Sequence, residues 1–108
     1  MVPDRLKMIE TMLASNPKDS FLQYAAALEH HKNGDIATAI KILQKIIKND
    51  PDYLASYYQL GKMLEERGKQ DEAIAVYKAG KTIAKKQSDM KTLGELTEAL
   101  MLLDVFED

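Results

Sequence analysis

The stretch LASYYQLGKMLEERGKQDEAIAVYKAGKTIAKKQ, residues 54–87, holds the pattern that decides the fold. Its features recur one period earlier, in residues 20–53 and the loop before them. The period is about 34 residues, a length typical of helix pairs that stack on one another. Six pairs share this one spacing: Pro17 and Pro51, Ala27 and Gly61, Gly34 and Gly68, Ala39 and Ala73, Ile40 and Ile74, and Leu43 and Tyr77. We therefore predict two consecutive repeats, 20–53 and 54–87.

Each repeat is expected to form two helices, because its apolar residues recur at spacings near 3.6. The predicted helices cover about residues 20–32, 36–48, 53–67 and 70–85. Gly34 and Gly68 are expected to end the first helix of each pair, since glycine readily takes the left-handed conformation. Asp35 is placed to cap the helix that follows. No stretch alternates with a period of two, so we predict no strand.

The two flanks of the repeats read as half-repeats. Residues 4–16 end at Asn16-Pro17, as the second helix of the first repeat ends before Pro51, so they are expected to form the second helix of a truncated repeat. After Ser88-Asp89, a natural helix start, residues 88–107 are expected to form a C-terminal capping helix that runs from about Met90 to Phe106. This gives about six helices.

The motif Tyr57-x2-Leu60-Gly61-x2-Leu64, followed by Gly68 and Ala73-x3-Tyr77, resembles the tetratricopeptide repeat. The first repeat departs from this pattern, with Gln23 where a bulky aromatic residue is usual. The resemblance implies an all-α fold, a right-handed superhelical stack of antiparallel helix hairpins, in a single domain over 1–108. It also implies a non-catalytic scaffold or adaptor that binds protein partners.

The composition excludes several kinds of site. The chain has no cysteine, which removes disulfides and thiolate-ligated metals. Its 15 Lys and Arg against 17 Asp and Glu give a net charge of -2, so we do not expect a nucleic-acid partner. His30 and His31 are adjacent and point about 100° apart on a helix, so they do not converge on a metal ion. We expect no cofactor and no enzymatic activity.

Local charge differs from the net charge. A lysine cluster gathers over residues 78–91 of the second repeat and the segment that follows it: Lys78, Lys81, Lys85, Lys86 and Lys91. We interpret it as a solvated outer face, and the alternative is a surface for an anionic partner or nucleic acid.

The N-terminus, Met1-Val2-Pro3-Asp4-Arg5, has no apolar stretch like the core of a signal peptide. The longest apolar runs, 24–28 and 99–103, have five residues each, whereas a membrane-spanning helix needs about 20. We therefore predict a cytoplasmic protein with no membrane partner.

In tetratricopeptide arrays the first helices line a concave groove that holds the ligand. The resemblance thus predicts a peptide groove formed by Tyr24, Leu28, Tyr58, Gln59 and Lys62. Phe21 also lies on the predicted groove face. For Tyr24 and Phe21 the alternative is that they simply pack on the N-terminal helix.

Members of the family that bind chaperones hold an acidic C-terminal tail with a clamp of Lys, Asn and Arg. The matching positions here are Tyr24, Leu28, Gln59, Asp89 and Leu93. Only Gln59 offers an amide, so we expect a partner that is rich in apolar and aromatic residues rather than a chaperone tail.

The last predicted helix carries more apolar residues than a capping helix needs. A stripe of leucines can face the stack, yet Met101, Leu102, Val105 and Phe106 add apolar area elsewhere. These four residues predict a self-association surface, such as that of a symmetric homodimer. The alternative is a tail that wraps the adjacent helix.

Overall fold

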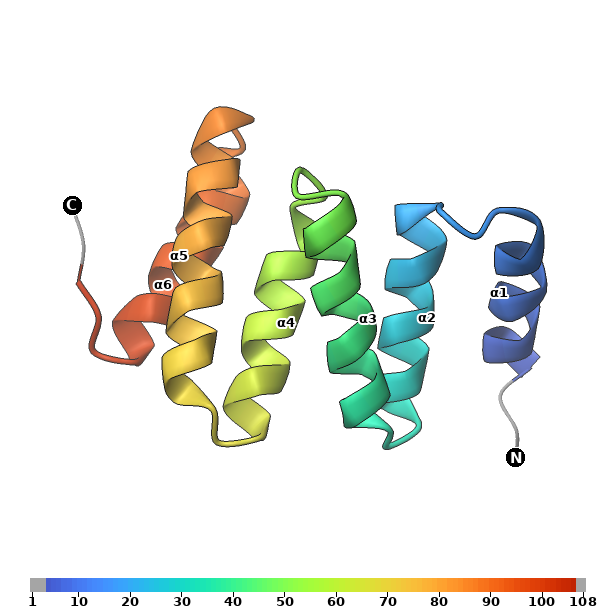
Figure 1. Cartoon of the computed structure of the whole chain (residues 1–108). Helices are drawn as coiled ribbons and strands as arrows, with labels where there is room; N and C mark the ends of the chain where they lie inside the picture. Colours follow the sequence, from blue (N-terminus) through green and yellow to red (C-terminus); the bar gives the residue numbers. More distant parts are fainter. Residues whose placement is uncertain (1–3, 107–108) are drawn as a thin grey trace. The chain divides into compact units, whose positions relative to one another are not determined.

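The computed structural model describes residues 4–106, and its regular secondary structure there is helical throughout (Figure 1). The helices are α1 (Asp4–Ser15), α2 (Ser20–Lys32), α3 (Ile36–Asn49), α4 (Ala55–Glu66), α5 (Gln70–Lys86) and α6 (Met90–Leu102). The prediction of an all-α fold with about six helices is confirmed. Residues 1–3 of the N-terminal motif, and residue 107 of the predicted capping helix, lie outside the described residues.

The helices group into two compact units, with the division between Tyr53 and Leu54. Unit 1 contains α1, α2 and α3, and unit 2 contains α4, α5 and α6. The division falls where we predict that the first repeat ends and the second begins. Each unit thus contains one predicted helix pair with one flanking helix.

The ends of α2 and α4 are built around the two predicted glycines. Gly34 has a φ of 89° and Gly68 a φ of 73°, both in the left-handed region. Directly after Gly34 in the chain, the Asp35 N–H donates a hydrogen bond to the His30 carbonyl at 2.8 Å. Directly after Gly68, the Lys69 N–H donates a hydrogen bond to the Leu64 carbonyl at 2.9 Å. This pattern satisfies carbonyls that a helix end leaves without partners, and it confirms the predicted stops.

The same motif ends α5 and α6, but without glycine. Ser88 has a φ of 57° and Asp104 a φ of 62°. The Asp89 N–H donates to the Ala84 carbonyl, and the Val105 N–H donates to the Leu100 carbonyl, both at 2.9 Å. Because Asp104 turns the chain here, α6 ends at Leu102, and the predicted continuation of the helix to about residue 106 is wrong.

Helix α5 has 17 residues, whereas its counterpart α3 has 14. The cause lies in the sequence: Lys85 takes the place in the second repeat that Pro51, the proline that follows α3, takes in the first. Without a proline, α5 continues to Lys86. The apolar pattern of α6 is displaced accordingly, because Leu96 and Leu100 lie two positions beyond the equivalents of Leu60 and Leu64.

In unit 2, two glycines allow the helices to approach one another closely. The Tyr77 ring of α5 lies directly over Gly61 of α4, where a Cβ atom would have no room. At Gly80 of α5, a Cβ atom would lie 2.7 Å from Cβ of Tyr57 and 3.1 Å from Cδ1 of Leu96. Gly80 therefore meets a packing requirement of α4 and α6, and this offsets the helix propensity that a glycine loses.

Unit 1 is packed mainly with small and aliphatic side chains. Its buried apolar residues are Ile9, Ala26, Ala27, Ala39, Leu43 and Ile46. One buried carboxylate, that of Glu29, has the guanidinium of Arg5 from α1 at 3.8 Å. Helix α1 is therefore joined to α2 by both apolar packing and an ion pair.

Three aspartates cap helices at their N-termini. Asp19, Asp35 and Asp89 accept hydrogen bonds from the backbone N–H groups three residues later, at 3.0, 3.2 and 3.0 Å. At Asp89, the backbone N–H and the hydroxyl of Thr92 hold the pKa of the carboxyl below its ordinary value. The predicted helix starts at Asp35 and Asp89 are confirmed.

Candidate functional site

In unit 2, the predicted groove residues of α4 lie on a face that is partly open to solvent. Tyr58 is half-buried and Lys62 is exposed. The Lys62 ammonium lies 5.9 Å from the centroid of the Tyr58 ring, within the range of a cation–π interaction. Gln59 beside them is half-buried. The aromatic ring and the cation are thus presented together.

The Tyr58 ring is supported from behind by Tyr77 of α5. The two ring centroids are 6.3 Å apart with an angle of 43° between the planes. The buried Tyr77 hydroxyl donates a hydrogen bond to the Glu65 carboxylate of α4. Burial, together with this hydrogen bond, raises the pKa of Tyr77 well above its ordinary value. We call Tyr58, Lys62, Glu65 and Tyr77 the Tyr58 cluster.

In unit 1, the predicted groove residues Tyr24 and Leu28 of α2 are both half-buried. The Tyr24 ring packs against Tyr53, with centroids 5.6 Å apart and planes at 56°. Burial is the main cause that raises the pKa of Tyr53, and the neighbouring Tyr24, Asp19 and Asp50 raise it further. The structure thus pairs Tyr24 with a residue of the segment that follows α3. Phe21 is 64% exposed.

The five predicted groove residues therefore form two groups, one on each unit. Tyr24 and Leu28 lie on α2, whereas Tyr58, Gln59 and Lys62 lie on α4. Sequence reasoning placed Glu65 on the same face as Tyr58 but missed its hydrogen bond from Tyr77, and it missed Tyr53 as the partner of Tyr24. Their contacts join residues 29 and 12 positions apart, and no local pattern indicates them.

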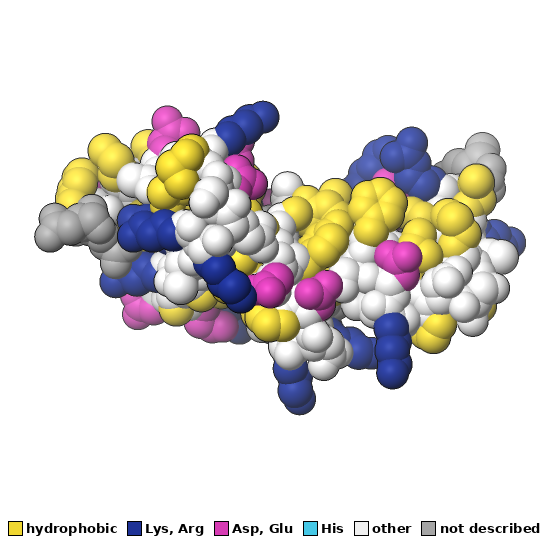
Figure 2. Space-filling model, turned by 90° about the horizontal axis from the view of Figure 1, so that it is seen from above, with side chains coloured by type: hydrophobic (Ala, Val, Ile, Leu, Met, Phe, Trp, Pro, Cys, Tyr) yellow, Lys and Arg dark blue, Asp and Glu magenta, His cyan; other side chains and the backbone are white. Residues whose placement is uncertain are grey.

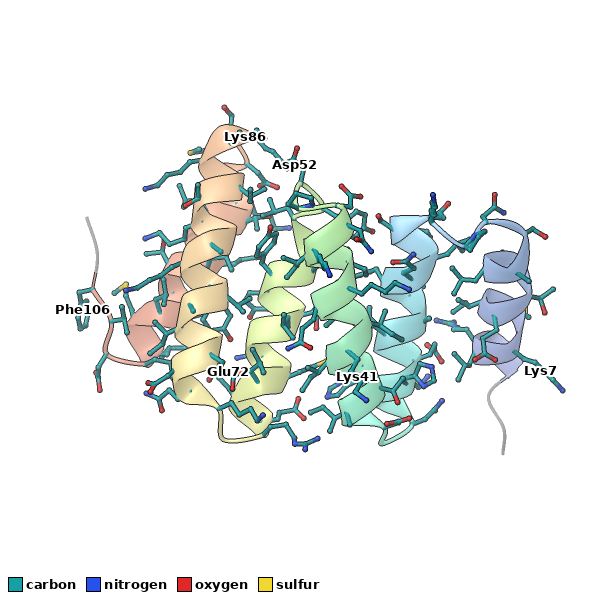
Figure 3. All side chains as sticks on the ribbon, in the orientation of Figure 1. Lys7, Lys41, Asp52, Glu72, Lys86 and Phe106 are labelled. Atoms are coloured by element: carbon teal, nitrogen blue, oxygen red, sulfur yellow. The ribbon has the colours of Figure 1, made fainter. Side chains whose placement is uncertain are left out.

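Apolar side chains are exposed at the C-terminal end of unit 2. Met101 is 48% exposed, Leu102 76% and Phe106 72%, while Val105 is half-buried. Figure 2 shows hydrophobic side chains gathered at the left end of the view. Phe106 lies beyond α6 and points away from the helices (Figure 3).

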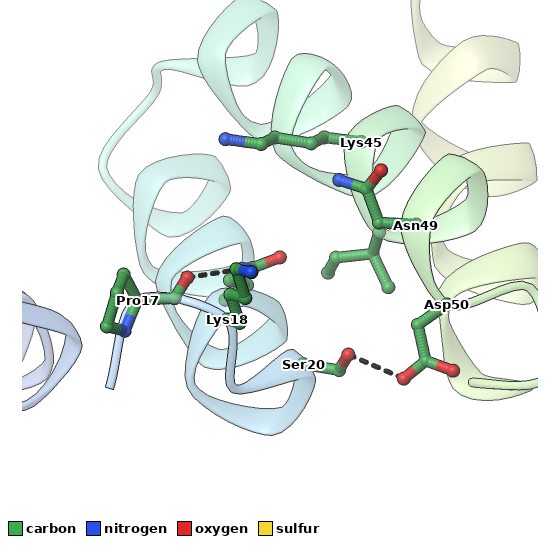
Figure 4. Close-up of a pocket in the computed structure, with 8 residues that line it drawn as sticks. Pro17, Lys18, Ser20, Lys45, Asn49 and Asp50 are labelled. Atoms are coloured by element: carbon green, nitrogen blue, oxygen red, sulfur yellow. Dashed lines mark hydrogen bonds between the residues drawn. The ribbon is translucent and has the colours of Figure 1, made fainter.

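A hollow of about 680 Å³ opens in unit 1 between α2, α3 and the loop before α2 (Figure 4). Its lining residues are Pro17, Lys18, Ser20, Gln23, Lys45, Ile46, Asn49 and Asp50. We call it the Gln23 hollow. A smaller hollow of about 300 Å³ shares Pro17, Gln23 and Lys45 with it and reaches α1 at Leu13 and Ala14. The sequence did not lead us to predict either hollow.

Residues 24–88, more than half of the chain, match the family model described as the tetratricopeptide repeat. The chain belongs to the tetratricopeptide repeat (TPR) family. This confirms the resemblance inferred from residues 54–87.

Individual TPR proteins resemble the chain over most of its length. It is 28% identical to a TPR repeat-containing protein of Pseudomonas aeruginosa over 96 residues, which are 89% of this chain and 91% of the relative. The crystal structure of a TPR domain protein from Salinibacter ruber is 35% identical, with a TM-score of 0.76 over 80% of this chain and 96% of that one. A protein of Bordetella parapertussis shares the fold alone, at 23% identity and a TM-score of 0.79, over 92% of this chain and 86% of that one.

TPR folds are scaffolds for protein–protein interaction, and their domains bind protein partners. In the part of this TPR chain that the structure describes, none of the helices combines the length and the apolar character that crossing a bilayer requires. Among residues 4–106, histidine and carboxylate side chains nowhere gather in groups of three or more that could hold a metal ion.

The lysine cluster of this TPR protein is not uniformly solvated. Lys78, Lys85, Lys86 and Lys91 are exposed, but Lys81 is only 6% exposed within α5. Our interpretation of all five as a solvated outer face is therefore wrong at Lys81. A long aliphatic stem lets a lysine pack along apolar neighbours, which a reading of charge alone does not capture.

Proposed function

We propose that this TPR protein is a non-catalytic scaffold or adaptor that binds a peptide segment of a protein partner through its first helices, α2 and α4. The observation that carries this proposal is the Tyr58 cluster. It presents a half-buried aromatic ring beside an exposed ammonium group, and Tyr77 and Glu65 support the ring from within unit 2.

The chemistry of this face favours a partner that is rich in apolar and aromatic residues. Tyrosine offers a rigid ring with a polar tip, and such residues often dominate the energy of binding. The carboxylate of Glu65 is already engaged by Tyr77, and that of Asp89 caps α6. Neither arrangement resembles a cationic clamp for an acidic chaperone tail. The cytoplasm remains our prediction for the compartment.

The proposal is tested by the double variant Tyr58→Ala and Lys62→Glu. Partners are captured from native cell extract with the wild-type chain, and the affinity of a captured partner is then measured by calorimetry. We expect a Kd of about 1 μM for the wild type. The variant should bind about 30-fold more weakly, because truncating a central aromatic contact costs about 2 kcal/mol.

Lys78→Glu is the matched control, since it makes the same charge change at an exposed position of α5 in the same unit. It should leave the affinity unchanged, and both variants should keep the helical circular dichroism of the wild type. If the double variant binds as tightly as the wild type, the groove hypothesis fails.

A second candidate function, self-association through the C-terminal end of unit 2, is favoured by the exposure of Met101, Leu102 and Phe106. Exposed apolar residues that lie together often mark an interface. Sedimentation velocity at several protein concentrations should show a dimer that Leu102→Glu with Phe106→Glu abolishes. A strict monomer at the highest concentration would exclude a dimer.

A further inference from the structure

The Gln23 hollow lies where unit 2 carries an aromatic ring from its own sequence. Gln23 and Tyr57 hold equivalent positions in the two repeats, and Tyr57 is only 3% exposed, packed beside Gly80 and Leu96. In the smaller adjoining hollow, Ala26 is the equivalent of the larger, buried Leu60. Two equivalent positions thus carry less volume in unit 1, whereas Ile46 of the lining takes the place of Gly80.

Hydrogen bonds keep the hollow from being filled by its own side chains. The Gln23 amide donates to the Pro17 carbonyl at 2.7 Å, which turns this side chain toward the loop. The Ser20 hydroxyl donates to the Asp50 carboxylate at 2.6 Å and joins the start of α2 to the end of α3 (Figure 4). Two sides of the hollow are therefore fixed.

The lining combines an apolar wall with a positive rim. Ile46 is 1% exposed and forms part of the wall, and the adjoining hollow adds aliphatic carbon from α1 and α3. Lys18 and Lys45 are exposed, whereas Asp50 is the single carboxylate among the eight lining residues. The two ammonium groups and one carboxylate leave a net charge of +1, which complements an anion.

We propose that the Gln23 hollow is a second recognition site, which holds an aromatic side chain of a partner protein whose neighbouring acidic residue pairs with Lys18 and Lys45. The inference rests on the proposed function in one respect, namely that the partner is a protein. The volumes of the two hollows fall within the range of ordinary ligand sites. An aromatic ring is the group that occupies the equivalent position in unit 2.

The test uses the full chain labelled with ¹⁵N and three capped tripeptides: acetyl-Glu-Trp-Glu-amide, acetyl-Lys-Trp-Lys-amide and acetyl-Glu-Ala-Glu-amide. We expect the first to shift the backbone amide signals of residues 18–23 and 45–50, with a Kd on the order of 1 mM. The lysine peptide should bind about fivefold more weakly, because exposed ion pairs contribute little each. The alanine peptide should not saturate.

Variants then connect binding to the hollow. Gln23→Tyr should place its own ring in the hollow and weaken binding of the tryptophan peptide at least about tenfold. Gln23→Leu is a second, smaller filling variant, should Gln23→Tyr lower the thermal stability. Lys45→Glu should weaken binding about fivefold, and Lys48→Glu, an exposed lysine of α3 outside the lining, should not.

Three outcomes overturn the proposal: signal changes absent from residues 18–23 and 45–50, equal affinity for the acidic and basic peptides, or equal effects of Lys45→Glu and Lys48→Glu. The double variant Tyr58→Ala and Lys62→Glu should bind the tryptophan peptide as the wild type does. A failure of the groove hypothesis would appear in that variant's affinity for a captured partner, so the two failures are distinguishable.

Discussion

At Gly61 and Gly94 the same residue type occupies helical positions with opposite surroundings. A Cβ atom at Gly61 would meet the Tyr77 ring, whereas a Cβ atom at Gly94 would have no described neighbour within 4 Å. The two glycines therefore have different reasons to be there, and an alanine scan can separate them.

We predict that Gly61→Ala lowers the free energy of unfolding by about 1 to 3 kcal/mol, because Tyr77 must move out of a packed position. Gly94→Ala should instead raise it by about 1 kcal/mol, the gain in helix propensity at an open site. Urea unfolding followed by circular dichroism measures both. Effects of the same sign would contradict the packing role of Gly61.

The hydrogen bond between Tyr77 and Glu65 gives unfolding a dependence on alkaline pH. The pKa of Tyr77 is raised in the folded chain, so above the ordinary tyrosine value of 10.0 the hydroxyl loses its proton mainly when the chain unfolds. Stability should therefore be complete below pH 10 and fall as the pH rises beyond it.

For Tyr77→Phe we predict a loss of about 1 to 2 kcal/mol at neutral pH, since a hydrogen bond to a carboxylate disappears. The variant should also show a smaller decline from pH 10 to about pH 11, because one shifted tyrosine is gone. Urea midpoints across this range provide the measurement. An equal decline in both proteins would show that Tyr77 does not cause it.

At the scale of helices, α2, α4, α5 and α6 each end with a residue in the left-handed conformation, but only at α2 and α4 is that residue a glycine. A residue with a Cβ atom is strained in this conformation, so Ser88 and Asp104 each lower the stability of the folded chain relative to a glycine at the same position. The backbone hydrogen bonds of the motif outweigh that strain.

Ser88→Gly should raise the free energy of unfolding by about 1 kcal/mol, because the turn is kept and the strain is removed. As a control, Ser15→Gly at the exposed last residue of α1 should lower it by up to about 0.5 kcal/mol. Thermal melts of the two variants distinguish these outcomes. A destabilised Ser88→Gly would mean that the serine has another role.

The sequence was most informative about helix ends, where the structure depends on residues that are adjacent in the sequence. Gly34, Asp35 and Gly68 act through local backbone conformation, so the predicted helix stops and start are confirmed. The end of α6 was missed because Asp104 turns the chain without the glycine that usually indicates such a turn.

The candidate sites were predictable only in part. Periodicity places Tyr58 and Lys62 one helical turn apart, so their shared face could be predicted. The departures at Gln23 and Ala26 are visible in the sequence, but the Gln23 hollow also depends on a hydrogen bond from Gln23 to the Pro17 carbonyl, which no local pattern indicates. The pairing of Tyr24 with Tyr53 likewise depends on how the chain returns after α3.

At the scale of the whole molecule, the net charge of -2 averages a lysine cluster with 17 acidic residues. Binding to a polyanion needs several cations that act together, and its affinity falls steeply with salt. The burial of Lys81 further reduces the cations that can reach a partner.

We therefore predict that the protein is not retained on a heparin column at about 50 mM salt. As a positive control, Glu95→Lys adds a cation at an exposed position of α6, close in sequence to Lys91. This variant should be retarded on the column, which would show that the column detects a more basic surface. Retention of the wild type beyond about 200 mM salt would favour an anionic partner instead.

The extra length of α5 matters to anyone who wishes to lengthen this array by design. Residues 20–53 include Pro51, so copies of that segment joined end to end would stop each second helix at a proline and keep one period throughout. Copies of residues 54–87 would carry Lys85 in its place, and α5 overruns α3 by three residues, or about 4.5 Å. The first repeat is therefore the better building block, although the second conforms more closely to its family's motif.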